Sequence, residues 1–265
     1  SFYEEWDGKE VEKDPLGNEV SARHPWNKDT RPKPAKIDWN SKYSWVTAPR
    51  WVYKGKVHVV EAGPIARMWT TAASRKVEGS TGSSLKFALP KTNLPRLTQA
   101  LNDELELEWK IPDRVNVIER LRARIYYLAY MTAVAYSEIL KVLDYLKKGK
   151  LEVFREFERP KWSLGVGLTE AGRGALGHWI IVKDGKIHRY QVITPSNFNA
   201  SPKDGEGRRG PYEEALLDTP ILEEGDADSW EGVDVVRTIR SMDPCLACGV
   251  TVYKGGRKVE KVING

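Results

Sequence analysis

The chain contains two cysteines, Cys245 and Cys248, which two residues separate. Thiols at this spacing are close enough to bind one metal ion or to form a redox-active disulfide. The redox alternative is disfavoured because a helix is predicted to end before Cys245 and a strand to follow Cys248, whereas redox motifs usually open a helix. Two buried thiols that pack as small apolar side chains are the structural alternative.

A site with four ligands needs two more donors than this pair supplies. The chain has no second C-x-x-C, and its histidines are too dispersed to complete a zinc ribbon: His24, His58, His178 and His188. If the cysteine pair binds a metal, a second polypeptide must therefore complete the site. A zinc-binding interaction module is a weaker alternative. The histidines are predicted to be structural, with His178 bracing a hairpin.

Arg173 lies between glycines in "GLTEAGRGALGHW". Glycines remove side-chain cover, so the backbone could approach a ligand closely while the guanidinium projects from it. An ordinary loop arginine paired with Glu170 is an equally weighted alternative. A comparable segment, "ITPSNFNASP", contains Pro195, which restricts the backbone, and Ser196, whose hydroxyl and N–H could bind an anion or a polar ligand. A simple turn is the structural alternative there.

A long helix is predicted over residues 113–148. Asp113 could cap its start, and Lys147, Lys148 and Gly149 form a typical basic last turn followed by a terminating glycine. Residues 125–135 are apolar nearly all round, so this helix is expected in the middle of a bundle. Apolar positions recur at spacings of three and four: Leu121, Ile125, Leu128, Met131 or Thr132, Ala135 and Ile139.

Shorter elements are predicted around this helix. A second helix is expected over 94–109 and a third over 232–242. "KVHVVEAGPIARM" predicts a short strand, a turn and a helix start. Two hairpins are expected, one around Asp184-Gly185 and one around Gly255-Gly256.

Residues 1–60 are predicted to be irregular because prolines interrupt every candidate element. Such a stretch should wrap a partner or another part of the protein, since alone it buries little. Residues 61–265 are expected to form one structural domain, completed by another chain. The fold class is α+β, with long buried helices of a bundle, small antiparallel β-hairpins and extensive irregular segments.

The composition narrows the function classes. The 265 residues carry a formal net charge of +5, and the charges are interspersed, which favours a solvated surface over nucleic-acid binding. Two cysteines exclude a secreted disulfide framework. No apolar run reaches the ~20 residues of a membrane-spanning helix, and "SFYEEWDGKEVEKD" lacks the signature of a signal peptide. Abundant Lys, Glu and Arg favour a thermophilic origin.

Five segments occur in an order that resembles one known family. They are "YSWVTAPRW", "VEAGPIARM", "LTEAGRGALGHWIIVKDGKIHRYQVITPSNFNASP", "GPYEEAL" and "IRSMDPCLAC", and they span nearly all of residues 40–250. Together they resemble the C-terminal half of a nickel–iron hydrogenase large subunit. The D-P-C-x-x-C motif with an upstream R-G-A-L-x-H-W is far more specific than a lone C-x-x-C.

The resemblance implies a Ni–Fe centre held by four cysteine thiolates, two of them from an N-terminal C-x-x-C. Cys245 would be a terminal nickel ligand and Cys248 a thiolate that bridges nickel and iron. The iron would carry CO and two cyanides, and donors of Arg173 and Ser196, in the loop that begins at Pro195, would face the cyanides. Asp243 would pair with Arg173, and either Arg173 or a thiolate such as Cys245 would receive the proton. Electrons would pass to iron–sulfur clusters in a small partner subunit.

The chain also departs from the family pattern. It lacks the N-terminal C-x-x-C and the acidic residue that passes protons, so either another chain supplies that half or this is a fragment. Thr251 stands where the family has a histidine that helps to hold a magnesium or similar ion. The segment after Thr251 resembles a tail that a maturation protease removes, and the substitution predicts that this tail is retained. Gly172 replaces the usual proline before Arg173.

Two classes of function follow. The first is an enzyme component that helps to cleave H2 into protons and electrons. The second is a structural or assembly subunit of a hydrogenase- or complex I-like redox complex, since respiratory complex I contains a related subunit without these cysteines. The joint presence of Arg173, Asp243, Cys245 and Cys248 favours the enzyme.

Overall fold

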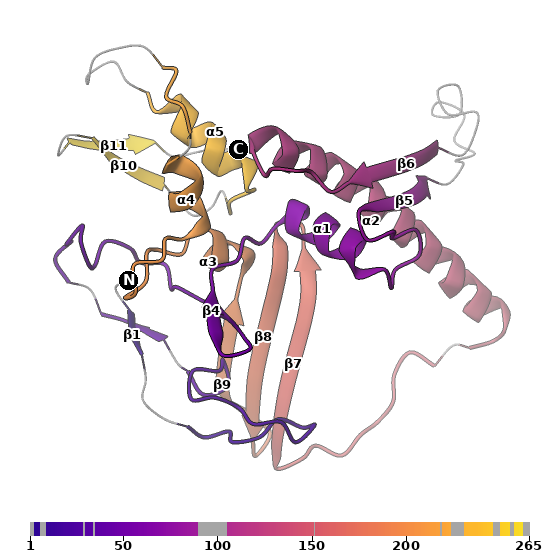
Figure 1. Ribbon diagram of the computed structural model, residues 1–265. Coiled ribbons are helices and arrows are strands. Elements are labelled where there is room, and N and C mark those ends of the chain that lie inside the picture. The colour runs from indigo at the N-terminus through magenta and orange to yellow at the C-terminus, as the bar shows by residue number, and fades with distance from the viewer. Residues whose placement is uncertain are drawn as a thin grey trace. The chain divides into compact units, whose positions relative to one another are not determined.

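The computed structural model describes residues 3–5, 9–28, 30–33, 35–89, 105–150, 152–217, 219–223, 231–245, 250–254 and 257–261. The chain forms two compact units. The first combines Ser1–Gly63 with Arg159–Gly265, and the second is Pro64–Glu158. Figure 1 shows the elements of both. None of the helices in the described ranges has both the length and the apolar character that a membrane crossing requires.

The second unit packs two helices against a two-stranded antiparallel sheet. Its elements are α1 (Pro64–Ser74), β5 (Ser84–Leu89), β6 (Leu105–Lys110) and α2 (Val117–Lys147). β5 pairs with β6, and Leu85 and Trp109, which face each other in this register, are fully buried. They share a core with residues of the two helices: Ile65, Met68, Ala72, Ala123 and Tyr127.

The helix predicted over 94–109 is wrong at its C-terminal end, because Leu105–Trp109 belongs to β6. "LELEW" alternates apolar and acidic residues with a period of two, which is the pattern of a half-buried strand. Residues 90–104 lie outside the described ranges.

The long helix α2 is confirmed, with a corrected start. It begins at Val117, and the side chain of Asn116 accepts a hydrogen bond from the Glu119 N–H, so Asn116 and not Asp113 is the N-cap. The helix ends at Lys147, and Gly149 follows with φ 69°, the left-handed conformation that terminates helices.

The apolar stripe predicted for the middle of a bundle is exposed in this chain. Leu121 is 39% exposed, and Ile125 and Leu128 are each 69% exposed. The face of α2 that packs against the unit's core is a different one, with Arg120, Ala123 and Tyr127 buried. Nothing in the described part of the chain buries the stripe, so its burial in a bundle stays a prediction.

The first unit is built on a three-stranded antiparallel sheet of β7 (Trp162–Ala171), β8 (Gly174–Lys183) and β9 (Lys186–Ile193) (Figure 1). The predicted turn at Asp184-Gly185 is confirmed. Both residues have positive φ, 49° and 73°, as a tight two-residue hairpin turn requires. His178 also braces the sheet, because its Nδ1 shares a hydrogen bond with the Tyr190 hydroxyl of the neighbouring strand.

Among its described residues, the segment before residue 60 forms short two-stranded pairings. β1 (Tyr3–Glu5) pairs with β2 (Thr30–Pro32), and β3 (Trp51–Tyr53) pairs with β4 (Lys56–His58). Residues 9–28 pack against the sheet: Val11, Val20 and Trp26 share a buried cluster with Ile181 of β8. The Trp26 indole N–H donates to the Gly165 carbonyl of β7 at 3.1 Å.

The remaining elements of this unit are short. They are α3 (Pro195–Asn199), α4 (Pro211–Leu217), α5 (Val233–Ser241), β10 (Val250–Lys254) and β11 (Arg257–Lys261). α5 confirms the helix predicted over 232–242, and the antiparallel pairing of β10 with β11 confirms the last hairpin. The mixed helix-and-sheet class with small antiparallel sheets is thereby confirmed.

Candidate metal centre

The sheet brings two candidate segments to one end. Each strand of the sheet β7-β8-β9 is antiparallel to its neighbour. β7 and β9 therefore run in the same direction and finish at the same end of the sheet (Figure 1). Arg173 lies in the two-residue loop that follows β7, because Ala171 pairs with Gly174. Ser196 lies in α3, which follows β9. The topology alone therefore places these residues close together.

The Arg173 loop is pressed against another backbone segment. Gly174 has φ 123°, and a Cβ atom built there would lie 2.4 Å from the Gly63 nitrogen, closer than real atoms approach. Only glycine fits this position. The Arg173 Nε donates a hydrogen bond to the Pro244 carbonyl at 3.3 Å, 71 residues further along the chain.

α3 is fixed at its start by its own capping residues. The Thr194 side chain accepts from the Asn197 N–H, and the Asn197 side chain accepts from the Thr194 N–H at 2.9 Å. Pro195 is buried and opens the helix, where its missing N–H costs nothing. The Ser196 Oγ accepts a hydrogen bond from the Cys245 N–H at 3.2 Å. Ser196 thus contacts the backbone of the cysteine loop directly.

The cysteine loop leaves α5 through a strained residue. Asp243 has φ 54°, in the left-handed region, although it precedes a proline, which restricts its backbone further. Asp tolerates this region better than most residues. The Asp243 N–H bonds to the Arg240 carbonyl at 3.0 Å, so the chain turns sharply away from the helix before Pro244. Cys245 is half-buried, and Cys248 lies outside the described residues.

A further residue, Asn199, joins the segments around this loop. Its side chain is 1% exposed and forms two hydrogen bonds with Ala62, accepting from the N–H at 2.8 Å and donating to the carbonyl at 2.7 Å. It also donates to the Met242 carbonyl at 3.4 Å. The sequence does not distinguish Asn199 from Asn197, which lies two residues earlier in the same motif, and sequence reasoning missed Asn199.

The structure therefore brings Arg173, Ser196 and Cys245 together and fixes Asp243 beside them. In the described ranges, no group of three or more His, Cys, Asp or Glu could hold a metal ion by itself. Cys248 lies outside these ranges. The donor types also fit: a thiol, which is a soft ligand for nickel or iron, stands beside hydroxyl and guanidinium donors suited to anionic ligands.

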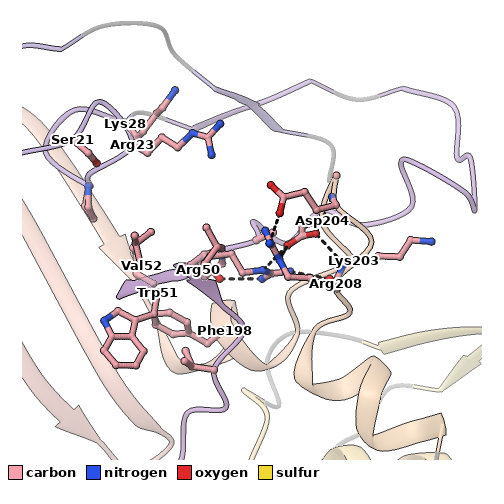
Figure 2. A pocket seen from close by; sticks show the side chains of 18 of the residues that line it. Ser21, Arg23, Lys28, Arg50, Trp51, Val52, Phe198, Lys203, Asp204 and Arg208 are labelled. Atoms are coloured by element: carbon pink, nitrogen blue, oxygen red, sulfur yellow. Dashed lines mark hydrogen bonds and ion pairs between the residues drawn. The ribbon is translucent and has the colours of Figure 1, made fainter. Parts of the chain in front are cut away.

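A separate pocket of about 1150 Å³ is lined in part by α3. Phe198 and Trp51 line it, and an ion cluster closes one edge (Figure 2). Arg50 and Arg208 both reach the Asp204 carboxylate, at 3.1 and 2.8 Å. Burial alone would raise the pKa of Asp204, but hydrogen bonds from Arg208 and Arg50 outweigh it and lower that pKa below its ordinary value. The cluster orders the loop over residues 201–210.

Tyr43 also contacts the loop over residues 201–210. Its hydroxyl donates to Glu213 at 2.6 Å and accepts from the Lys203 N–H at 3.0 Å. Burial, followed by the bond to the Glu213 carboxylate, raises the pKa of Tyr43 to about 12. This phenol therefore stays protonated at neutral pH and serves as a structural donor.

Comparison with known proteins decides the family. The model of the nickel-dependent hydrogenases matches residues 7–251. The chain belongs to the nickel-dependent hydrogenase family. An uptake hydrogenase large subunit of Rhodobacter capsulatus is 33% identical over 252 residues, and the hydrogenase-1 large chain of Escherichia coli is 32% identical over 252 residues.

Solved hydrogenases of this family also share the fold. An actinobacterial-type NiFe-hydrogenase from Ralstonia eutropha is 43% identical, with a TM-score of 0.84 over 92% of this chain. The Ni-Fe-Se hydrogenase from Desulfomicrobium baculatum is 32% identical, with a TM-score of 0.58 over 93% of this chain. The resemblance drawn from the sequence motifs is confirmed at the level of the family.

This hydrogenase-family chain spans well under half the length of its relatives. The match covers 93% of the chain but 37% of the Rhodobacter capsulatus protein, and 89% of the chain but 38% of the Escherichia coli protein. For the Ralstonia eutropha structure, the share is 44% of that chain.

Proposed function

We propose that this chain is the C-terminal component of a nickel–iron hydrogenase large subunit, and that the assembled enzyme reversibly cleaves H2 into protons and electrons. One observation carries the proposal. In a chain of this family, Arg173 and Ser196 both bond to the backbone of the loop that presents Cys245. An arginine and a serine from separate elements thus both contact the backbone at Pro244 and Cys245.

Cys245 and Cys248 would both hold the nickel–iron centre through their thiolates. Thiolates are soft ligands that suit both metals, and a coordinating thiol is deprotonated. When bound, the centre supplies the Lewis-acid and redox chemistry that splits H2, with CO and cyanide as further ligands of the iron. Two more thiolates are needed, and these would come from the other part of the large subunit.

Residues of this chain would position the cysteine loop and take part in proton transfer. Ser196 holds the Cys245 N–H and so fixes where the thiol-bearing residue lies. Nε of Arg173 is engaged with Pro244, and within the described ranges the guanidinium has no other bond, so its remaining N–H groups can face cyanide or accept a role in proton transfer. Asp243 would pair with Arg173, and Arg173 or Cys245 would hold the proton released from H2.

The proposed partners are the N-terminal part of the large subunit and an iron–sulfur small subunit that takes the electrons. A magnesium or similar ion near the C-terminus would lose one ligand, because Thr251 stands in place of the family's histidine. The side chain of Thr251 lies outside the described ones.

Metal analysis of the assembled complex tests the proposal. Cys245→Ala and Cys248→Ala should each abolish nickel incorporation, while the exposed Ser137→Ala should leave it unchanged. Full nickel content and H2 uptake in a double alanine variant would contradict the proposal. A wild-type complex without any metal would favour the structural or assembly subunit, and zinc alone would favour a zinc-binding module.

A further inference from the structure

The pocket of about 1150 Å³ is formed entirely by the first unit. Its lining residues come from 21–60 and from 179–208, so two distant parts of the chain close around one space. The volume lies just above the range of about 300–1,000 Å³ that is usual for small-molecule sites. Arg173, Ser196 and Cys245 are not among the residues that line it.

One wall of the pocket is aromatic, and neighbouring residues hold its rings in place. The indole of Trp179 lies over Gly177, because a Cβ atom built on this glycine would be 2.1 Å from Cη2 of the indole. A larger residue at position 177 would therefore displace the ring. The His24 ring meets the same indole edge to face, with 6.3 Å between the ring centroids. Phe198 of α3 adds a further ring to the lining.

Trp51 brings a partly uncovered indole to the pocket. It lies in β3 and stacks on Tyr53, with 5.2 Å between the ring centroids and 23° between the ring planes. Trp51 is nevertheless 53% exposed, so the stack leaves much of its indole open. Open indoles bind the flat faces of ligand rings, and such stacking tolerates rings of many kinds.

The pocket also has a surplus of positive charge. In the ion cluster at one edge, Arg50 and Arg208 are balanced by Asp204 and Glu206. Three more cationic residues line the pocket: Arg23, Lys28 and Lys203. Figure 2 shows Arg23 and Lys28 apart from the ion cluster, so their charges are not neutralised by its carboxylates.

Arg23 is the cation best suited to hold an anion. It is exposed, and among the described residues its guanidinium has neither an ion pair nor a hydrogen bond. The planar guanidinium can donate two parallel hydrogen bonds to one phosphate or carboxylate group. His24 beside it adds no charge at neutral pH, because burial lowers the pKa of His24 below its ordinary value.

We propose that this pocket binds a small molecule that joins a flat ring to a phosphate group, the chemistry of a nucleotide. The ring stacks on Trp51, and Arg23 holds the phosphate while Lys28 adds positive charge. An apolar ligand would leave the surplus charge unmatched, and an inorganic anion would leave the aromatic wall uncovered. The inference needs neither the metal centre nor the proposed function.

Isothermal titration calorimetry of the assembled complex tests the site with ADP as the probe. Adenosine supplies the ring alone, and pyrophosphate supplies the anion alone. We expect ADP to saturate one site per chain and both fragments to bind at least about tenfold more weakly, because each lacks the stacked ring or the charge-assisted hydrogen bonds. Equal affinity for ADP and pyrophosphate, equal affinity for ADP and adenosine, or no binding of ADP would each overturn the proposal.

Substitutions locate ADP in the pocket. Arg23→Ala and Trp51→Ala alter exposed residues, so thermal unfolding should stay within a few degrees of wild type. Each should weaken ADP binding about tenfold. The matched controls Arg155→Ala and Trp39→Ala, at exposed sites that do not line the pocket, should bind ADP as the wild type does.

A conservative variant separates lost stacking from lost structure. Trp51→Phe keeps a flat ring, so it should retain most of the affinity that Trp51→Ala loses. Loss of binding in Trp51→Phe equal to that in Trp51→Ala would contradict stacking on this residue. Unchanged ADP affinity in both Arg23→Ala and Trp51→Ala would place the ligand outside the pocket and overturn the proposal.

Discussion

Asn199 holds two segments of the chain through one side chain. Its amide satisfies both backbone groups of Ala62 and reaches the Met242 carbonyl, directly before the cysteine loop. Because the side chain is almost fully buried, water cannot replace these bonds. Asn199 is therefore a positioning residue, which acts on Cys245 through the backbone.

Replacement of Asn199 by alanine should be costly. Asn199→Ala leaves the buried N–H and carbonyl of Ala62 without partners, and unsatisfied groups cost about 1–3 kcal/mol each. We expect a loss of roughly 2–4 kcal/mol in the free energy of unfolding, seen as a lower denaturant midpoint. The exposed Asn40→Ala should change it by less than about 0.5 kcal/mol. Equal midpoints for the two variants would show that the hydrogen bonds of the Asn199 side chain do not stabilise the protein.

Arg173 is predicted to support turnover more than assembly. Arg173→Lys keeps the positive charge but loses the planar fork, whose Nε donates to the Pro244 carbonyl. Activity of the complex should fall by roughly a hundredfold, the scale for loss of a positioned proton-transfer group, while nickel content stays normal. Arg155→Lys, at an exposed site, should have wild-type activity. Wild-type turnover in Arg173→Lys would reduce Arg173 to a structural contact.

At the scale of elements, the β7–β8 hairpin has two glycines with opposite requirements. Gly174 has φ 123° and touches the Gly63 backbone, whereas a Cβ on Gly172 would meet nothing within 4 Å. The turn that presents Arg173 thus depends on one glycine and tolerates replacement of the other. The pair offers a matched comparison within a single loop.

Gly174→Ala should destabilise the protein by about 2–4 kcal/mol, from backbone strain and from overpacking against Gly63. It should also lower nickel content, because a shift of the loop away from Gly63 would disturb the bond of Arg173 to Pro244. Gly172→Ala should be neutral or slightly stabilising, since it restricts the unfolded chain without strain. Thermal unfolding of both variants measures this. Similar melting temperatures would mean that the close approach at Gly63 is not maintained in solution.

At the scale of the whole molecule, residues 9–28 pack against a sheet that begins more than a hundred residues later in the sequence. Trp26 fills the cluster with Ile181 and donates to the Gly165 carbonyl, and Glu10 forms an ion pair with Arg189 at 3.0 Å. This loop-rich segment is stable because its apolar side chains share a core with β7 and β8. Local sequence provides little of that stability.

Trp26→Ala should therefore cost about 3–5 kcal/mol, the range for truncation of a buried tryptophan. Trp26 is 4% exposed, whereas Trp39 is 58% exposed, so Trp39→Ala serves as the control and should cost far less. Chemical denaturation followed by circular dichroism compares the two. If both variants lose the same stability, the packing of this segment on the sheet is not a main source of stability.

Sequence reasoning succeeded where the deciding physics is local. The turn at Asp184-Gly185 forms because both positions need positive φ, and α2 ends at Lys147 because a basic turn and Gly149 follow. The family was recognisable because D-P-C-x-x-C and the arginine loop are contiguous motifs. Cys245, Arg173 and Ser196 could be named as candidates on that basis.

Tertiary structure decided the contacts between distant segments. β6 is a strand because it pairs with β5 across a loop, which a helix pattern over 94–109 does not reveal. Arg173 and Ser196 contact the cysteine loop because β7 and β9 finish at the same end of an antiparallel sheet. Asn199 joins the same loop through a long-range bond that no local pattern encodes. Periodicity shows that α2 has an apolar face, but only the packing of the chain shows that Arg120, Ala123 and Tyr127 are the side chains buried in the described structure.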